Sequence, residues 1–144
     1  MSVDAIPVVG LTLHFRTPVQ TVACLHSLQA EGIRHAIVVD NSEDGGKSLT
    51  AMQARLDELK ASGLRIDVET AERNLGFAHG VNRGLTRAVA ARAASVLLIN
   101  SDACLERGAL AALLHGLSNA PVVTTKFTLA INCKPDAAEP KPLS

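Results

Sequence analysis

Aromatic residues are scarce in this chain: its 144 residues include no Trp, no Tyr and only three Phe. This scarcity argues against a protein that stacks bases or sugars on aromatic platforms. A net charge is also lacking, because 14 basic residues balance 14 acidic ones. The basic footprint of a nucleic-acid-binding protein is therefore missing. The chain also has no block of like charges of the kind that would indicate a membrane surface as a partner.

Paired cysteines and long apolar runs are missing as well. Cys24, Cys104 and Cys133 are odd in number and show no C-x-x-C spacing. We therefore expect reduced thiols rather than a disulfide framework or a zinc site. No apolar stretch approaches the roughly 18 residues that a transmembrane helix needs, and the first residues do not follow the pattern of a signal peptide. These absences predict a soluble, cytoplasmic protein with no membrane span, and the length suits one domain.

Short apolar runs alternate with helical patterns along the chain. Strands are expected at Pro7–Leu13, His35–Val39, Leu64–Val68 and Ser95–Ile99, with a weaker fifth candidate at Val122–Thr125. Helices are expected at Pro18–Glu31, Lys47–Ser62, Phe77–Ala94 and Glu106–Leu117. This order predicts an α/β fold with a Rossmann-like, doubly wound and mostly parallel sheet. The third strand alternates polar and apolar residues, which predicts one exposed face.

The domain boundary is expected near the end of the chain. Residues 1–131 should form the folded α/β domain, and residues 132–144, which hold three prolines, should form a flexible tail. In a parallel sheet, ligands bind at the carboxyl ends of the strands. The residues that directly follow each expected strand are therefore the candidate site.

Two carboxylates, Asp40 and Asp102, directly follow expected strands, and each suits a different part of a ligand. Asp40 can accept a hydrogen bond from the N–H of a pyrimidine base. Asp102, helped by Asn100, can hold Mg²⁺ or Mn²⁺ against a diphosphate, since these ions favour oxygen ligands and bind through one or two carboxylates plus phosphate oxygens. Arg83, or Arg73, can add a positive charge near the phosphates.

Three motifs together resemble family 2 glycosyltransferases, and rhamnosyltransferase-like members in particular. Val38–Ser42 followed by Gly45-Gly46 is similar to the family's VVDNSS.DG element, and Asn74–Ala78 followed by Asn82-Arg83-Gly84 is similar to N.GFA...N.G. Leu97–Ala103 is similar to the LLLNPD form of the D-x-D motif. The motifs occur in the family's order, over roughly residues 6–123. The opening strand differs, because His14-Phe15 stands where the family usually has Tyr-Asn.

The resemblance implies the nucleotide-binding half of a GT-A fold, a UDP- or dTDP-sugar donor, a divalent metal and inverting sugar transfer. It implies that Asp40 contacts the base and that Asp102, with Asn100, binds the metal and diphosphate. Asn41, Asn74, Gly76 and Phe77 would complete the donor pocket together with Arg83. A polysaccharide or cell-wall precursor is the kind of acceptor that the resemblance suggests.

Two departures from the family support an alternative. Asn100 replaces the first carboxylate of D-x-D, and the acids after Asp102 (Glu106, Asp136 and Glu139) offer no convincing general base. The family's acceptor half is thus expected to be missing. The alternative is a truncated, inactive homologue that acts as a nucleotide- or protein-binding module. An uncovered sheet edge would then favour a homo-oligomer.

Structural roles compete with these functional ones. Asp40 can form a turn after its strand, and Asp102 can cap the helix expected near Glu106.

Other motif readings fit less well. Gly45-Gly46-Lys47-Ser48 lacks the earlier glycine of a P-loop, because Asn41 stands at that position. A response-regulator-type domain would want an acidic pair after the first strand, which is absent. Gly76, Gly80 and Gly84 favour close helix packing. Among the five histidines, His79 is the one inside a motif.

Overall fold

The computed structural model describes residues 8–71, 73–74 and 76–120. The strands are β1 (Val8–His14), β2 (His35–Asp40), β3 (Arg65–Thr70) and β4 (Ser95–Leu98). The helices are α1 (Pro18–Ala30), α2 (Lys47–Ala61), α3 (Gly76–Ala90) and α4 (Ala109–Leu117). The expected fifth strand and the expected tail at 132–144 lie outside the described residues.

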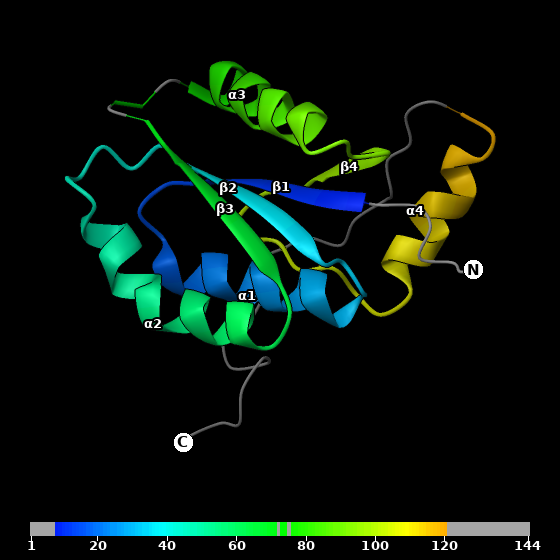
Figure 1. Cartoon of the computed structure of the whole chain (residues 1–144), viewed down its shortest axis with the longest axis horizontal. Coiled ribbons are helices and arrows are strands. Elements are labelled where there is room, and N and C mark those ends of the chain that lie inside the picture. Colours follow the sequence, from blue (N-terminus) through cyan, green and yellow to red (C-terminus); the bar gives the residue numbers. More distant parts are fainter. Residues whose placement is uncertain (1–7, 72, 75, 121–144) are drawn as a thin grey trace.

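The four strands form one parallel sheet in the order β3-β2-β1-β4. Helices α1 and α2 cover one face and α3 covers the other (Figure 1). This is the Rossmann-like, doubly wound α/β fold that the alternating sequence pattern predicts. Helix α4 lies to one side of these layers, near the amino-terminal end of β1 (Figure 1).

Each face of the sheet has its own apolar core. The larger core joins α1 and α2 to the sheet through side chains that include Leu25, Leu28, Val38, Met52 and Leu56, all 1% exposed or less. The smaller core lies under α3 and contains Val9, Leu11, Ile37, Val39 and Ala88. Strands β1 and β2 contribute to both cores, so their near-continuous Val, Ile and Leu content follows from burial on both faces.

The polar face of β3 is covered, contrary to the expectation of an exposed face. Asp67 and Glu69 point to the side of the sheet where α3 lies, and their side chains are only 17% and 18% exposed. Arg83 and Arg87 of α3 pair with Glu69, and Arg87 also lies 3.7 Å from Asp67. The expectation failed because alternation shows only that a face is polar, and this one is neutralised by a helix.

Two glycines let α3 pack closely on the sheet, as their spacing predicts. A Cβ at Gly84 would lie 2.2 Å from Leu11 Cδ1, and one at Gly80 would lie 2.7 Å from Leu13 Cδ2. Both distances are too short for any side chain larger than hydrogen. The height of α3 above β1 is therefore set by these two residues.

Helix α4 begins later than expected and is capped from a distance. Gly108 is its N-cap residue. The carboxylate of Glu31, just after α1, accepts hydrogen bonds from the backbone N–H groups of Gly108 (3.1 Å) and Leu110 (3.0 Å). Asp102 lies well before this cap and does not serve it.

The cysteines differ from one another. Cys24 is a buried free thiol whose pKa is raised to about 12, chiefly by burial. Cys104 is engaged in a disulfide. The expectation of reduced thiols therefore holds for Cys24 and is wrong for Cys104, because cysteine spacing along a sequence does not report distance in space.

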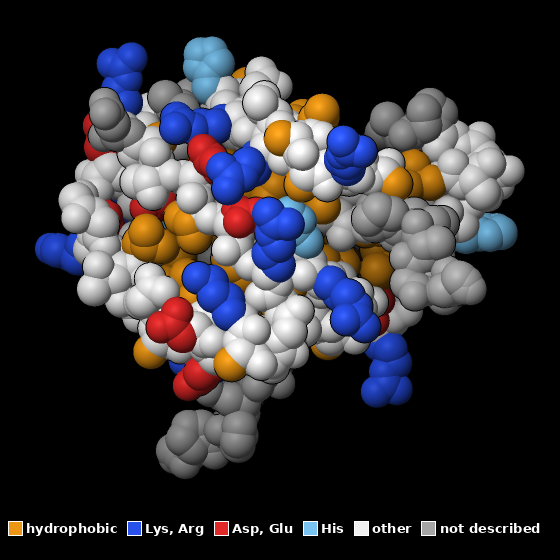
Figure 2. All heavy atoms as spheres, in the orientation of Figure 1, with side chains coloured by type: hydrophobic (Ala, Val, Ile, Leu, Met, Phe, Trp, Pro, Cys, Tyr) orange, Lys and Arg blue, Asp and Glu red, His pale blue; other side chains and the backbone are white. Residues whose placement is uncertain are grey.

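Acidic and basic side chains are interspersed with apolar ones on the face shown in Figure 2. This mixture agrees with the balanced charge of the whole chain. Within the described ranges, no helix has both the length and the apolar character needed to cross a bilayer.

Candidate functional site

Strand β1 is the topological switch point of the sheet, because β2 and β3 lie on one side of it and β4 lies on the other. The chain builds outward from β1 through β2 to β3, and then returns to place β4 on the other side of β1. The helix that follows β1 (α1) and the helix that precedes β4 (α3) therefore lie on opposite faces of the sheet. Ligands in open α/β sheets bind in the crevice that forms at such a switch point.

A cavity of about 460 Å³ lies at this switch point. Four chain segments line it: the end of β1 with the loop that follows, the residue after β2, the start of α3, and the end of β4 with its loop. The lining residues are Leu13, His14, Phe15, Thr17, Asn41, Asn74, Gly76, Phe77, Leu98, Ile99, Asn100, Ser101 and Asp102.

Six of the eight residues expected at the nucleotide and metal site line this one cavity. Asp40 and Arg83 do not. The six come from three segments that are far apart in the sequence, and the fold brings them together: Asn41, Asn74, Gly76, Phe77, Asn100 and Asp102.

Asn41 presents a buried polar group with unused hydrogen-bonding capacity. Only 4% of the residue is exposed. Its backbone N–H donates to His14 O (2.9 Å), and its side-chain Nδ2 lies 3.5 Å from Gly76 O. Its Oδ1 atom is buried and has no hydrogen-bond partner among the described residues. A buried acceptor without a partner is costly, and a ligand donor in the cavity would satisfy it.

The Asp40 side chain is buried and hydrogen-bonded to the protein's own backbone. It is 3% exposed, and its Oδ1 accepts a hydrogen bond from the backbone N–H of Ser42 (3.0 Å). This contact is the turn-forming role that an aspartate after a strand can have. Asp40 thereby shapes the loop that carries Asn41 and Ser42, while Asn41 is the residue that reaches the cavity.

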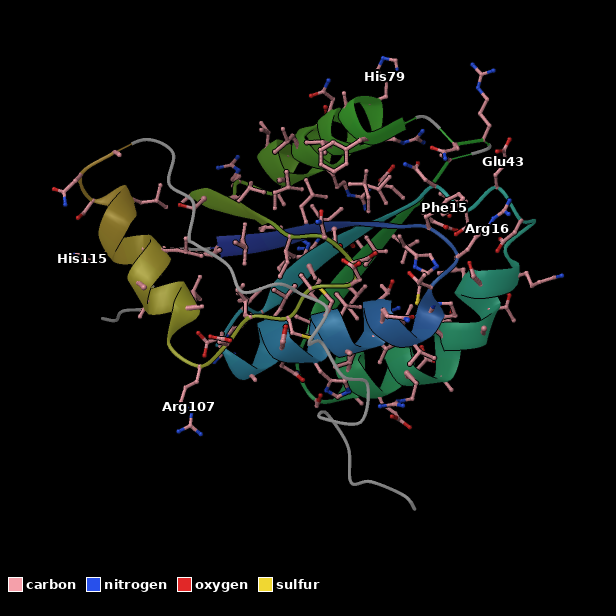
Figure 3. The ribbon with its side chains drawn as sticks, turned by 180° about the vertical axis from the view of Figure 1, so that it is seen from behind. Phe15, Arg16, Glu43, His79, Arg107 and His115 are labelled. Carbon is pink, nitrogen blue, oxygen red and sulfur yellow. The ribbon has the colours of Figure 1, made fainter. Side chains whose placement is uncertain are left out.

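The start of α3 forms the second wall. Asn74 Oδ1 accepts a hydrogen bond from the Gly76 backbone N–H (2.8 Å), and Gly76 adopts a positive φ of 80° that favours glycine. This turn opens the helix, and the next residue, Phe77, is 59% exposed. His79 points away from the sheet on the outer side of α3 (Figure 3) and does not line the cavity.

The loop after β4 brings to the cavity the two residues expected to bind a metal, Asn100 and Asp102. Asn100 and Asp102 are both exposed. The backbone O of Asn100 accepts a hydrogen bond from Ala103 N–H (3.0 Å), so the loop closes into a turn. No group of three or more His, Cys, Asp or Glu side chains that could hold a metal occurs in the described part of the chain. The carboxylate of Asp102 and the amide oxygen of Asn100 therefore suit a cation shared with a ligand, rather than one held by protein alone.

Arg83 does not line the cavity. It donates to the Glu69 carboxylate at 3.3 Å and is part of the charge pairing between α3 and β3. Among the described residues, the cavity lining contains no Lys or Arg, and Asp102 is its only carboxylate. An anionic ligand would therefore meet a lining without a fixed positive charge.

Sequence reasoning missed a buried hydroxyl and imidazole network beside the cavity. His14 is fully buried, with Nδ1 2.7 Å from Thr21 Oγ1 and Nε2 3.1 Å from Ser48 Oγ. Ser48 Oγ in turn donates to Ser42 Oγ at 3.0 Å. Burial lowers the pKa of His14 below its usual 6.5, although the charges of Asp40 and Asp44 oppose the shift. The network ties α1 and α2 to the two loops that flank the cavity.

Arg16 fastens those two loops at the rim. Its backbone N–H donates to Ser42 Oγ (2.9 Å), and its guanidinium donates to Ser42 O (2.7 Å) and Glu43 O (3.2 Å). The same guanidinium lies 5.0 Å from the centre of the Phe15 ring. Figure 3 shows Phe15, Arg16 and Glu43 together at this end of the sheet, far from Arg107 and His115.

Comparison with known proteins adds no relative. No protein-family model matches the chain, and no curated protein matches it. The functional interpretation therefore rests on the cavity and on the motifs that line it.

Proposed function

We propose that this chain is the nucleotide-sugar-binding domain of a family 2 glycosyltransferase with a GT-A fold, for inverting transfer from a UDP- or dTDP-sugar. One observation carries the proposal: the cavity at the switch point is lined by residues from all three motifs that resemble this family. The strand ends of any parallel sheet meet at one edge, so the support comes from the oxygen-bearing side chains that the three motifs bring to this cavity: Asn41, Asn74 and Asp102.

The base and ribose take the side of the cavity formed by Asn41 and the start of α3. The unpartnered Oδ1 of Asn41 accepts a hydrogen bond from the N–H of the base. A uracil or thymine ring offers such a donor. Asn74 Oδ1 accepts a hydrogen bond from the Gly76 N–H, so its Nδ2 is the side-chain atom that would donate to the ligand. Asp40 acts indirectly in this proposal, by holding the loop that presents Asn41.

The diphosphate takes the side formed by the loop after β4. A bare diphosphate would be repelled by Asp102, since the described part of the lining holds no Lys or Arg side chain to offset the repulsion. Mg²⁺ or Mn²⁺ removes this conflict, with Asp102 and Asn100 as its protein ligands and phosphate oxygens completing the shell. Bound there, the metal ion would neutralise charge on the leaving nucleoside diphosphate.

A second function is favoured by a specific observation. Inverting transfer needs a base that takes the proton of the acceptor hydroxyl. Asp102, the only carboxylate among the described residues that line the cavity, is committed to the metal in this proposal. A nucleotide-binding module without transfer activity is therefore the alternative, and release of sugar from a UDP- or dTDP-sugar would decide between the two.

Calorimetric titration with UDP, dTDP and GDP in the presence of Mn²⁺ tests the proposal. Binding of at least one nucleotide is expected with Mn²⁺, and much weaker binding is expected when the metal is chelated. Mn²⁺ alone should bind weakly, because the protein supplies only two ligands. Failure of all three nucleotides to bind to folded protein would refute the proposal.

Asp102→Asn should reduce Mn²⁺-dependent nucleotide binding by at least about tenfold, because it removes the charged metal ligand. The matched control is Glu106→Gln, which removes an exposed carboxylate four positions further along that does not line the cavity. The control should bind as the wild type does. Equal losses in both variants would show that general charge, and not the metal site, is responsible.

A further inference from the structure

The two Phe side chains that the structure describes both lie at the cavity. Phe15 and Phe77 are the only aromatic residues of the Phe, Tyr and Trp type within the described ranges, and both line it. They come from separate segments, the loop after β1 and the first turn of α3. Composition argued against stacking on aromatic platforms, but composition reports how many rings exist and not where the fold places them.

Both rings are left open to solvent, although they are the largest apolar side chains in the described part of the chain. Phe15 is 46% exposed and Phe77 is 59% exposed. Exposed apolar side chains that share one cavity are typical of a ligand-binding surface. Among the described lining residues these two are the only Phe, Tyr or Trp side chains, and the imidazole of His14 is fully buried.

Phe15 is held in place from one side. The Arg16 guanidinium lies 5.0 Å from the ring centre, within the range of a cation–π contact. That guanidinium is itself fixed by hydrogen bonds to the carbonyl oxygens of Ser42 and Glu43. One face of the ring is thus occupied by a fixed partner, while the ring as a whole still borders the cavity.

We propose that Phe15 and Phe77 together form the surface on which the nucleobase of the donor lies, and that Arg16 is a positioning residue that fixes the Phe15 ring. This inference rests on the proposed function. Stacking on aromatic rings accepts any base, since every base has a π face. The hydrogen-bond acceptor of Asn41 then distinguishes between bases. The rings thus supply affinity and Asn41 supplies selectivity.

Two ligands that differ by the nucleoside test this division. UDP with Mn²⁺ carries the base, and inorganic pyrophosphate with Mn²⁺ does not. Phe15→Leu and Phe77→Leu keep an apolar side chain but remove the ring. Each variant should weaken UDP binding by about five- to a hundredfold, the range for loss of one base stack, and leave pyrophosphate binding unchanged. Val89→Ala, which trims an exposed apolar residue of α3 outside the cavity, is the matched control and should bind both ligands normally.

The outcomes separate this inference from the proposed function. If the wild type binds none of UDP, dTDP and GDP with Mn²⁺, the proposed function fails, and this inference fails with it; if it binds dTDP but not UDP, dTDP replaces UDP in this test. If the wild type binds UDP but either Leu variant binds it with unchanged affinity, the two-ring surface is wrong and the proposed function stands. Equal losses for UDP and pyrophosphate would also overturn the inference, because they would indicate a distorted cavity.

A proton NMR measurement gives a second readout. The chain has no Trp or Tyr, so its aromatic region holds only Phe and His signals. The H5 and H6 resonances of bound uracil should show ring-current shifts and nuclear Overhauser contacts to two Phe spin systems. Arg16→Lys should reduce the contacts from one ring and keep those from the other. Contacts to no Phe ring would contradict the proposal.

Discussion

Single residues at the ends of the strands carry the strongest functional signal, and they divide into two groups. Asn41 and Asp102 turn toward the cavity, whereas Asp40 and His14 spend their polar atoms on neighbouring loops and helices. Adjacent residues such as Asp40 and Asn41 thus have different roles. The direction of a side chain is fixed by the loop it belongs to, and a sequence motif does not contain that direction.

His14 should make the fold sensitive to mild acid. Burial keeps its pKa below the usual 6.5 against the opposing charges of Asp40 and Asp44, so the unfolded chain binds a proton more readily than the folded one. The free energy of unfolding should therefore fall as the pH drops through 6.5 toward 5. Asp67 does not contribute in this window, because its pKa lies below the usual 3.8: the hydrogen bond from His35 and the charges of Arg65 and Arg87 outweigh its burial.

Urea denaturation of His14→Gln at pH 7.5, 6.5 and 5.5 checks this prediction. The variant should be less stable than the wild type at pH 7.5, and its stability should change less with pH. The exposed His79 serves as the control, and His79→Gln should keep the wild-type pH dependence. An unchanged pH slope in His14→Gln would show that another group is responsible.

At the scale of elements, the apolar runs predicted the strands well, because β1 and β2 are buried on both faces and such strands are unmistakably apolar. Helix ends were less predictable. Expected to start near Glu106, α4 begins at Ala109, since its cap comes from Glu31 and not from a neighbouring residue. The ends of helices depend on partners that are distant in sequence, which periodicity cannot reveal.

Helix α3 shows how one element can determine the shape of the cavity. Its first turn carries Gly76 and Phe77 to the cavity, and Gly80 and Gly84 set its distance from β1. The glycine spacing predicted this close packing. Its consequence for the cavity could not be predicted, because the sequence does not reveal which strand the helix crosses.

Gly84→Ala should destabilise the protein by about 1–3 kcal/mol, the usual range for overpacking a core. Alanine favours a helix over glycine by about 1 kcal/mol, but the new Cβ would lie 2.2 Å from Leu11, which is fully buried and cannot move aside freely. Asn82→Ala, on an exposed position of the same helix, is the control and should be neutral or slightly stabilising. Thermal unfolding measures both, and equal stability of Gly84→Ala and wild type would contradict the close packing.

At the scale of the whole molecule, ion pairs join the α3 layer to the sheet. Asp67 and Glu69 of β3 pair with Arg83 and Arg87 of α3, so an edge strand is joined to a helix by ionic contacts where apolar contacts are few. The balanced charge of the chain gave no hint of this arrangement. Arg83, expected near phosphates, has a structural partner instead.

Glu69→Gln should lower the free energy of unfolding by about 1 kcal/mol, the upper end for partly exposed ion pairs. High salt should reduce the difference between the variant and the wild type, because screening weakens the lost pairs. Glu58→Gln is the control, since Glu58 is 68% exposed and its contact with Arg55 should contribute almost nothing. Equal effects of the two substitutions would indicate that the β3 and α3 pairing adds no stability.

The position of β4 has a consequence for the order in which the molecule forms. Val8 pairs with Ser95 across nearly the whole described chain, while β1 and β2 meet much earlier. Closing that long loop is entropically slow, so β4 should dock last during synthesis, onto a scaffold that already holds β1, β2 and β3. Asn100 and Asp102 arrive with β4. A nascent chain would thus complete the cavity at the switch point only when β4 docks, and a ligand that binds there would favour completion of the fold.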